Sequence, residues 1–287
     1  IHGGKFYALP QSPQLFKQVL MVGGIDRYFQ VVRCFRDEDL RMDRQPEFTQ
    51  LDIEMSFVGP DQIYAMVEGM MALVFREVKG VELETPFPRL RWEEAISRFG
   101  TDKPDLRFGL ELVELSDHFR DSEVMIFKRA LAAGGIVKGL RVPGGAKLSR
   151  KEIDDLTNLV GRYGAKGLAW IKVLEGEWQS PLTKFLRDSE MEALQKLTQS
   201  RPGDVIFILA DDGGIVNEGL ANLRLELGRR MNLVEAGSYA FSWVVDFPLL
   251  EWKTTEGRYT AVHHPFTAPL EEDVPFLAND PGRVKSR

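Results

Sequence analysis

Two runs of residues between Asp26 and Val58 constrain the fold of this chain more than any other stretch. In the second run, apolar residues occupy the odd positions, and mostly polar residues occupy the even ones. Successive side chains of a strand point to opposite faces, so this alternation predicts a strand with one apolar and one polar face. The apolar row is Leu51, Ile53, Met55 and Phe57, and the polar row is Phe48, Gln50, Asp52, Glu54 and Ser56.

The first run predicts a second strand, and Gln30, Arg36 and Glu38 share one of its faces by the same even spacing. If the two strands pair in antiparallel order, Arg36 and Glu38 come close to the polar row of the other strand. The charged face is then either a surface for a ligand or a face exposed to water. The alternation alone leaves both interpretations open.

The bulk composition excludes several classes of protein. The 287 residues are enough for two domains, and the net charge of −6 leaves nucleic-acid contact only to local arginines and lysines. No apolar run reaches the ~20 residues of a membrane helix, and the lone Cys34 excludes a disulfide scaffold. We therefore expect a cytoplasmic protein without membrane contact, in which Cys34 is a buried, inert thiol. The chain opens at Ile1 in mid-pattern, so we also expect a fragment.

A short helix is expected before the two strands. Ser12 predicts its N-cap and Pro13 its first position, and the glycine pair 23–24 predicts its end. Gln14 and Lys17 lie one turn apart on one face of this helix. That face meets either solvent or a ligand.

The loop between the two strands, Asp39–Pro46, carries alternating charges that include Arg41 and Arg44. A loop of this kind is either mobile surface or a clamp for an anionic ligand. After it, an amphipathic helix is expected from Pro60 and a short helix at Trp92–Phe99.

A turn-rich linker at residues 100–105 precedes a change of pattern to short alternating strands and helices. A second linker follows near residue 237, so we expect a separate α+β domain between them. The glycines at 143–145 lack the Gly-Lys-Ser/Thr element of a phosphate loop and are interpreted as a turn. Expected strands are Lys5–Leu9 in the first part and, beyond the linker, Gly109–Val113, Val124–Phe127, Ile136–Val142, Leu168–Val173 and Val205–Leu209. Expected helices run from Ser149 to Gly164, from Glu190 to Leu197 and from Val216 to Met231.

The last part of the chain is strand-like again. A strand at Phe241–Phe247 and a returning strand at Arg258–His263 are expected to form a hairpin around a turn at 254–257. His263 and His264 are adjacent and point to opposite faces of a strand, so they do not suit one metal ion. We expect no metal site in this chain.

Specific residues of the two-strand stretch resemble motif 2 of the class II aminoacyl-tRNA synthetases. The matching residues are Phe35–Glu38, then Phe48, and then Asp52–Glu54 after the charged loop. Other segments are similar to bacterial-type aspartyl-tRNA synthetases, including their insertion domain. These segments are Gln11–Lys17, Val142–Ala146, Tyr163–Ala169, Trp243–Pro248 and His263–Thr267.

The resemblance implies an α+β fold, in which a class II antiparallel catalytic sheet flanked by helices is interrupted by a smaller α+β insertion domain. Residues 1–103 are then the first part of the catalytic domain, 104–237 the insertion domain and 238–287 the truncated continuation. The implied activity is that of an aspartate–tRNA ligase. ATP activates L-aspartate to aspartyl-adenylate, and the aspartyl group passes to the 3′ end of tRNA. Both steps depend on positioning and charge stabilisation rather than on a protein nucleophile.

The resemblance also implies roles for individual residues. Arg36 is the expected catalytic residue, bridging the aspartate carboxylate and the α-phosphate with its planar fork. The expected ATP contacts are Arg36, Asp37, Glu38, Gln45 and Phe48, with Phe48 stacked on adenine. The expected aspartate contacts are Gln14, Lys17, Arg36, Asp52, His263 and His264, with Lys17 on the side-chain carboxylate and Asp52 on the ammonium group. Asp39 and Arg41 are the expected contacts of the tRNA acceptor end.

Parts of the family pattern are missing from this chain. It lacks motif 1, which forms the dimer interface, and motif 3, which holds the ATP phosphates; the acidic Mg²⁺ ligands and the anticodon-binding barrel are also missing. We expect the full-length protein to be a homodimer that uses ATP with Mg²⁺ and charges aspartate tRNA, with asparagine tRNA as a second candidate. We expect this fragment alone to show little ATP–pyrophosphate exchange.

Two other functions remain open at this point. The first is an ATP-dependent asparagine synthetase on the same scaffold, against which the large insert argues. The second is a non-catalytic tRNA-binding paralogue, against which the intact Arg36, Glu38, Phe48 and Lys17 argue. Ammonia-dependent asparagine formation and loss of adenylate formation in Arg36→Ala discriminate these alternatives.

Overall fold

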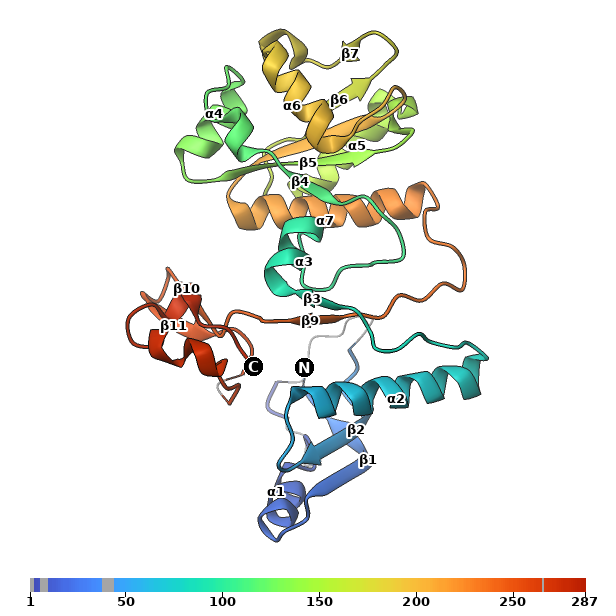
Figure 1. The fold of residues 1–287 in the computed structure, drawn as a ribbon, viewed down its shortest axis with the longest axis vertical. Coiled ribbons are helices and arrows are strands. Elements are labelled where there is room, and N and C mark those ends of the chain that lie inside the picture. The colour runs from blue at the N-terminus through green and yellow to red at the C-terminus, as the bar shows by residue number, and fades with distance from the viewer. Residues whose placement is uncertain (1–2, 6–9, 38–43, 265) are drawn as a thin grey trace. The chain divides into compact units, whose positions relative to one another are not determined.

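The structure is a computed structural model that describes residues 3–5, 10–37, 44–264 and 266–287 (Figure 1). The strand expected at Lys5–Leu9 falls largely outside these residues. The chain divides into two compact units, Ile1–Pro86 and Phe87–Arg287, and each is described by itself. Among the described residues, no helix is both long and apolar enough to cross a lipid bilayer.

The first unit contains the predicted hairpin. Strand β1 (Arg27–Phe35) pairs in antiparallel order with β2 (Glu47–Met55), and the register places Gln30 opposite Asp52 and Cys34 opposite Phe48. Helix α1 (Gln14–Val22) precedes the hairpin and α2 (Pro60–Lys79) follows it. The helix α1 begins one residue later than expected, because Pro13 rather than Ser12 takes the N-cap position and no side chain caps it.

The two faces of the hairpin differ in exposure, and the polar face contains the better-buried residue. Asp52 on the polar face is only 6% exposed, whereas Leu51 on the apolar face is 44% exposed. Phe57 leaves the strand pattern because β2 ends at Met55, and it is 97% exposed with a backbone φ of 59°. Leu51 and Phe57, two members of the predicted apolar row, are therefore exposed in the described part of the chain. Cys34 is buried, as predicted.

The second unit is built on a five-stranded sheet. Its strand order is β4-β5-β8-β6-β7, and every neighbouring pair is antiparallel. The strands are β4 (Leu112–Glu114), β5 (Ile136–Val142), β6 (Ala169–Val173), β7 (Trp178–Gln179) and β8 (Val205–Asp211). The helices packed with it are α4 (Met125–Ala132), α5 (Arg150–Gly161), α6 (Asp188–Thr198) and α7 (Gly213–Arg230).

Apolar side chains form one core on each face of this sheet. Helices α5 and α7 supply Leu156 and Leu220 to the core on one face, against Phe207 of β8. On the other face, α4 and α6 supply Phe127 and Leu194 against Ile206. Figure 1 shows α7 on the side of the sheet opposite α4 and α6. The sheet is thus covered by helices on both faces, which confirms the expected α+β character of this part.

Three sequence-based assignments in the second unit are wrong. The segment Val124–Phe127 starts helix α4 rather than a strand, since a short apolar run fits either element and here Phe127 turns inward while Ile126 stays 49% exposed. The strand expected at Gly109–Val113 is displaced to Leu112–Glu114.

The third error concerns the last hairpin, which is formed by β10 (Leu250–Lys253) and β11 (Arg258–Ala261). The run at Phe241–Phe247 instead contains β9 (Trp243–Val245), which pairs in parallel with β3 (Arg89–Arg91). A positive φ of 57° at Asp246 and the following Pro248 interrupt the run, so the partner of β11 begins only after them.

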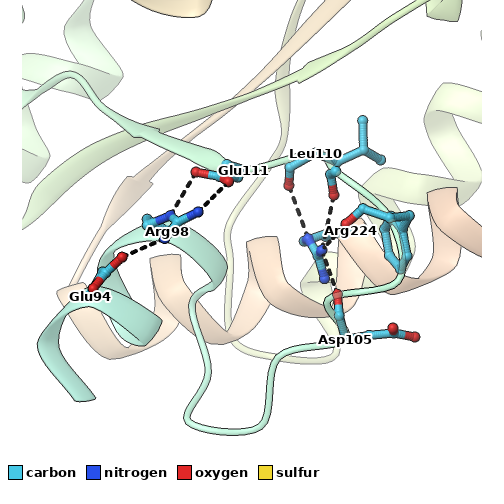
Figure 2. Close-up of polar contacts among 8 residues, drawn as sticks. Glu94, Arg98, Asp105, Leu110, Glu111 and Arg224 are labelled. Carbon is cyan, nitrogen blue, oxygen red and sulfur yellow. Dashed lines mark hydrogen bonds and ion pairs between the residues drawn. The ribbon is translucent and has the colours of Figure 1, made fainter. Parts of the chain in front are cut away.

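Helix α3 (Trp92–Phe99) packs against elements that follow the linker (Figure 2). Arg98 forms a bidentate pair with Glu111, with Nη2 2.6 Å from Oε1 and Nε 2.8 Å from Oε2. Lys138 of β5 donates from Nζ to the carbonyl oxygens of Ile96 and Ser97 near the end of α3. The proposed domain boundary at 103/104 stays a prediction, but α3 is fastened to the sheet beyond it.

Candidate functional site

Arg36 lies directly after β1, where the hairpin loop begins. Its backbone N–H donates to the carbonyl oxygen of Pro46 at 2.9 Å, which fixes the start of the loop against its end. The guanidinium carbon lies 5.2 Å from the centre of the Phe48 ring, a cation–π distance. Its Nε is buried and has no hydrogen-bond partner among the described residues. The sheet register therefore brings Arg36 and Phe48 together, as the sequence predicts.

Asp52 lies on the same polar row of β2 as Phe48 and is held by helix α1. Lys17 Nζ donates to Asp52 Oδ1 at 3.0 Å and lies 3.2 Å from Glu54 Oε2. The other carboxylate oxygen of Asp52, Oδ2, is buried without a hydrogen-bond partner among the described residues. Glu54 was not predicted as a site residue, although its place on the same polar row was the signal for it.

The Lys17 ammonium is stabilised as a cation by its two neighbours. Burial alone lowers the pKa of Lys17, but the hydrogen bonds that Lys17 donates to Asp52 and Glu54, with the charges of these carboxylates, outweigh burial and raise that pKa above its usual value of 10.5. Lys17 therefore remains protonated throughout the neutral range, between the two side chains that accept its hydrogen bonds.

This cluster predicts a specific dependence of stability on alkaline pH. The contribution of Lys17 to the unfolding free energy should be fully present below pH 10.5, the unfolded value, and should be lost as the pH rises through the higher folded value. Denaturant titrations of wild type and Lys17→Met from neutral to alkaline pH measure that contribution as their difference. A difference that declines already in the neutral range contradicts this assignment.

The two unpaired atoms define what the hairpin surface can bind. A buried donor or acceptor without a partner costs about 1–3 kcal/mol, and more when it is charged, so Arg36 Nε and Asp52 Oδ2 are poised for a ligand. One is a cationic donor and the other an anionic acceptor. Phe48 and Asp52 are four residues apart on one strand face, which corresponds to about 13 Å. The arrangement suits an elongated ligand with an anionic group near Arg36 and a cationic group near Asp52.

The first unit contains further residues for which a role is predicted. Gln14 is exposed at the start of α1, and Gln45 and Asp37 are exposed at the two ends of the loop. Glu38, Asp39 and Arg41 lie outside the described residues. Their assigned roles stay predictions.

His263 and His264 belong to the second unit, and both are exposed. The ring of His263 lies 4.7 Å from that of Phe247 in an edge-on contact. His264 Nδ1 accepts the backbone N–H of Phe266 at 3.1 Å. The rings thus have different neighbours, and their role in substrate binding stays a prediction.

Histidine, cysteine, aspartate and glutamate side chains are the groups that could hold a metal ion in this chain. In the described ranges, no three histidine, cysteine, aspartate or glutamate side chains converge in a way that could hold a metal ion. Mg²⁺ that accompanies ATP takes many of its ligands from phosphate oxygens and water, so its binding by the full-length protein stays a prediction.

Comparisons with known proteins identify the family of the chain. A family model for class II tRNA synthetases (D, K and N) matches residues 1–285. The chain is 53% identical over 287 residues to the aspartate–tRNA(Asp/Asn) ligase of Geotalea uraniireducens, an alignment that covers 100% of this chain and 48% of that protein. It is 54% identical over 288 residues to the ligase of the same name from Desulfatibacillum aliphaticivorans, again with 100% and 48% coverage.

A third relative has a narrower name. The aspartate–tRNA ligase of Halalkalibacterium halodurans is 52% identical over 287 residues, which are 100% of this chain and 48% of that protein. The chain thus spans about half the length of the curated relatives it matches. Since the family model covers nearly the whole sequence, the chain belongs to the class II tRNA synthetases of the D, K and N group.

Proposed function

We propose that the full-length protein is an aspartate–tRNA ligase, which activates L-aspartate with ATP and transfers the aspartyl group to tRNA. The observation that carries this proposal is the pair of unpaired, buried polar atoms on the hairpin, Arg36 Nε and Asp52 Oδ2. Together they match the opposite charges of an amino acid placed beside a phosphate. The names of the relatives, which specify aspartate as the amino acid, support the same conclusion.

In the first step, an oxygen of the aspartate α-carboxylate attacks the α-phosphorus of ATP, and the bond to pyrophosphate breaks. Arg36 neutralises the charge on the carboxylate and the α-phosphate, and the stabilisation increases as charge develops in the transition state. Phe48 offers a ring for the adenine, and Asp52 Oδ2 accepts from the substrate ammonium. In the second step, the terminal ribose hydroxyl of tRNA attacks the aspartyl carbonyl, and AMP leaves.

Selectivity for aspartate is assigned to α1. Lys17, held between Asp52 and Glu54, supplies the positive charge for the side-chain carboxylate of the substrate, with Gln14 one turn away. Of the remaining predicted contacts, Asp37, Glu38 and Gln45 are assigned to ATP, and Asp39 and Arg41 to the acceptor end of tRNA. His263 and His264 are assigned to the substrate side chain. The Mg²⁺ that accompanies ATP, the homodimer and the insertion-domain boundaries belong to this proposal.

The proposal is tested on the full-length protein by ATP–pyrophosphate exchange with aspartate, asparagine or glutamate. We expect exchange that depends on aspartate, with rates at least about 100-fold lower for asparagine, because a neutral amide cannot make the charge-assisted hydrogen bond that Lys17 offers to the side-chain carboxylate of aspartate. Equal exchange with asparagine contradicts the role given to α1. Ammonia-dependent release of asparagine without tRNA supports the alternative synthetase.

A separate charging assay addresses the tRNA. The relatives include proteins named for aspartate tRNA alone and for both aspartate and asparagine tRNA. Aspartylation of each purified tRNA by the full-length protein, with equal protein and tRNA concentrations, distinguishes the two specificities. Failure to charge either tRNA while exchange is intact favours the asparagine synthetase.

A further inference from the structure

A cavity of about 650 Å³ opens at one end of the five-stranded sheet in the second unit, where β6 and β8 separate. The pairing of β6 with β8 ends at Ala169 and Ile208, whereas β8 continues to Asp211. The segment before β6, residues 165–168, therefore separates from β8, and the cavity lies beside the segment. This segment belongs to the Gly-Ala-Lys-Gly-Leu-Ala run that the sequence singles out and to which no role in aminoacylation is assigned above.

The walls of the cavity are mainly apolar. They are lined by Ile126 of α4, Leu168 and Trp170 around the start of β6, Leu182 after β7, and Val216 of α7. Ile126 is 49% exposed, and the sheet core does not cover it. A cavity of this size and composition is in the range that takes a small organic molecule.

The charged groups on the walls are mostly positive. Arg129 of α4 and Lys166 of the separated segment both line the cavity, and neither forms an ion pair with a carboxylate of the described residues. Arg150 also lines it, with its guanidinium carbon 5.7 Å from the Trp170 ring centre and Nε bonded to Asp154 at 3.1 Å. One carboxylate, Asp211, lies on the wall and accepts the backbone N–H of Asp212.

We propose that this cavity is a binding site for a small organic anion, a carboxylate or phosphate carried on an apolar or aromatic body. The apolar walls take the body, and Arg129 and Lys166 take the anionic group by charge-assisted hydrogen bonds. The unpaired length of β8 beside the cavity supplies backbone groups that orient the ligand. No residue that lines the cavity belongs to the hairpin, so the proposal does not depend on the proposed aminoacylation function.

Two probes with the same aromatic skeleton, one of which carries a sulfonate group, test the proposal on the full-length protein. The anion is 8-anilinonaphthalene-1-sulfonate and its uncharged counterpart is N-phenyl-1-naphthylamine, and both gain fluorescence in apolar sites. Titrations are made with ATP and L-aspartate present, so that the proposed active site is occupied. We expect one saturable site for the anion, and an affinity for the uncharged probe at least about tenfold lower.

Charge reversal assigns the site to the cavity. The double variant Arg129→Glu with Lys166→Glu should weaken binding of the anion at least about tenfold. The matched control is Lys128→Glu with Lys151→Glu, which changes the net charge by the same amount. Both lysines are exposed: Lys128 directly precedes Arg129 on α4, and Lys151 directly follows Arg150 on α5. The control should change the affinity less than about twofold, since it removes no direct contact. The double glutamine variant at 129 and 166 gives a second test if the charge reversal impairs folding.

Energy transfer from tryptophan tests where the anion binds. Excitation of tryptophan should sensitise emission of the bound anion, and Trp170→Phe should reduce the sensitised emission while saturable binding remains. Equal affinities for the two probes, equal weakening in the control, or no saturable binding in wild type would each overturn the proposal. Unchanged binding in both the glutamate and the glutamine variants would do the same.

Discussion

Replacing Arg36 by alanine in the full-length protein is expected to lower aspartate-dependent ATP–pyrophosphate exchange by about 10³-fold or more. The guanidinium lies beside Phe48 with a buried Nε that has no partner among the described residues. Its proposed ligands are the two groups that react, the carboxylate and the α-phosphate. A loss of 10³ corresponds to about 4 kcal/mol of transition-state stabilisation, which is reasonable for a charged, bidentate donor at the reacting atoms.

The charge-conserving Arg36→Lys variant separates charge from geometry. Lysine supplies a point charge but not the planar fork that can contact two anionic groups at once. We therefore expect Arg36→Lys to recover only part of the lost exchange rate. Its effect should fall on kcat more than on the KM for ATP, since the contact strengthens in the transition state.

A matched control for Arg36 lies three residues earlier, within β1. Arg33 is 69% exposed at its side chain and pairs with Glu47 at 3.1 Å, and a surface pair of this kind contributes at most about 1 kcal/mol. Arg33→Ala should therefore leave exchange within about twofold of wild type. If both alanine variants lose activity equally while circular dichroism is unchanged, or if Arg36→Ala retains normal exchange, the role assigned to Arg36 is wrong.

The hairpin could be predicted from the sequence because its signal is local. Period-two alternation fixed the two strands and the polar row, and antiparallel pairing then brought Arg36 near Phe48. The partner of Lys17 could not be predicted in the same way. Asp52 is 35 positions away, and its contact with Lys17 depends on how α1 packs on the hairpin, which no local pattern specifies.

The local sequence pattern also led to a wrong assignment where a strand and a helix have the same pattern. The four apolar residues at 124–127 fit a strand or the first turn of a helix, and only packing of Phe127 in the core decides for the helix. Which face of the hairpin is buried could not be predicted, for a different reason. Alternation distinguishes two faces, but it does not specify which face other elements cover, and here Asp52 is better covered than Leu51.

For Arg224, the sequence indicates its position on the apolar face of a helix but not its contacts. It lies on α7 one turn from both Leu220 and Leu227, so helical spacing places it on the apolar face. In the structure it is 1% exposed, between the rings of Phe99 and Phe108, at 4.9 and 4.1 Å from their centres. Burial lowers the pKa of this guanidinium, and the carboxylates of Asp105 and Glu111 oppose that effect.

The second large effect is expected from Arg224→Met, which keeps the apolar stem and removes the guanidinium. The guanidinium donates to four backbone carbonyl oxygens of the segment that follows α3, at 2.7–3.0 Å (Figure 2). These oxygens belong to Asp105, Phe108, Gly109 and Leu110. Removing a buried charged donor leaves its acceptors without partners, so we expect the second unit to lose about 3–5 kcal/mol of stability.

The measurement for Arg224 must resolve the two units, because a chain with two units need not unfold in one step. Native-state hydrogen exchange followed by mass spectrometry does so, through peptides from residues 105–111 and from α7. Arg229→Met is the control on the same helix, since Arg229 is 73% exposed at its side chain and pairs only with Glu226 among the described residues. If the protection of residues 105–111 falls equally in both variants, Arg224 is not the group that fastens this segment to α7. A selective loss in Arg224→Met establishes that this one buried guanidinium fastens residues 105–110 to α7.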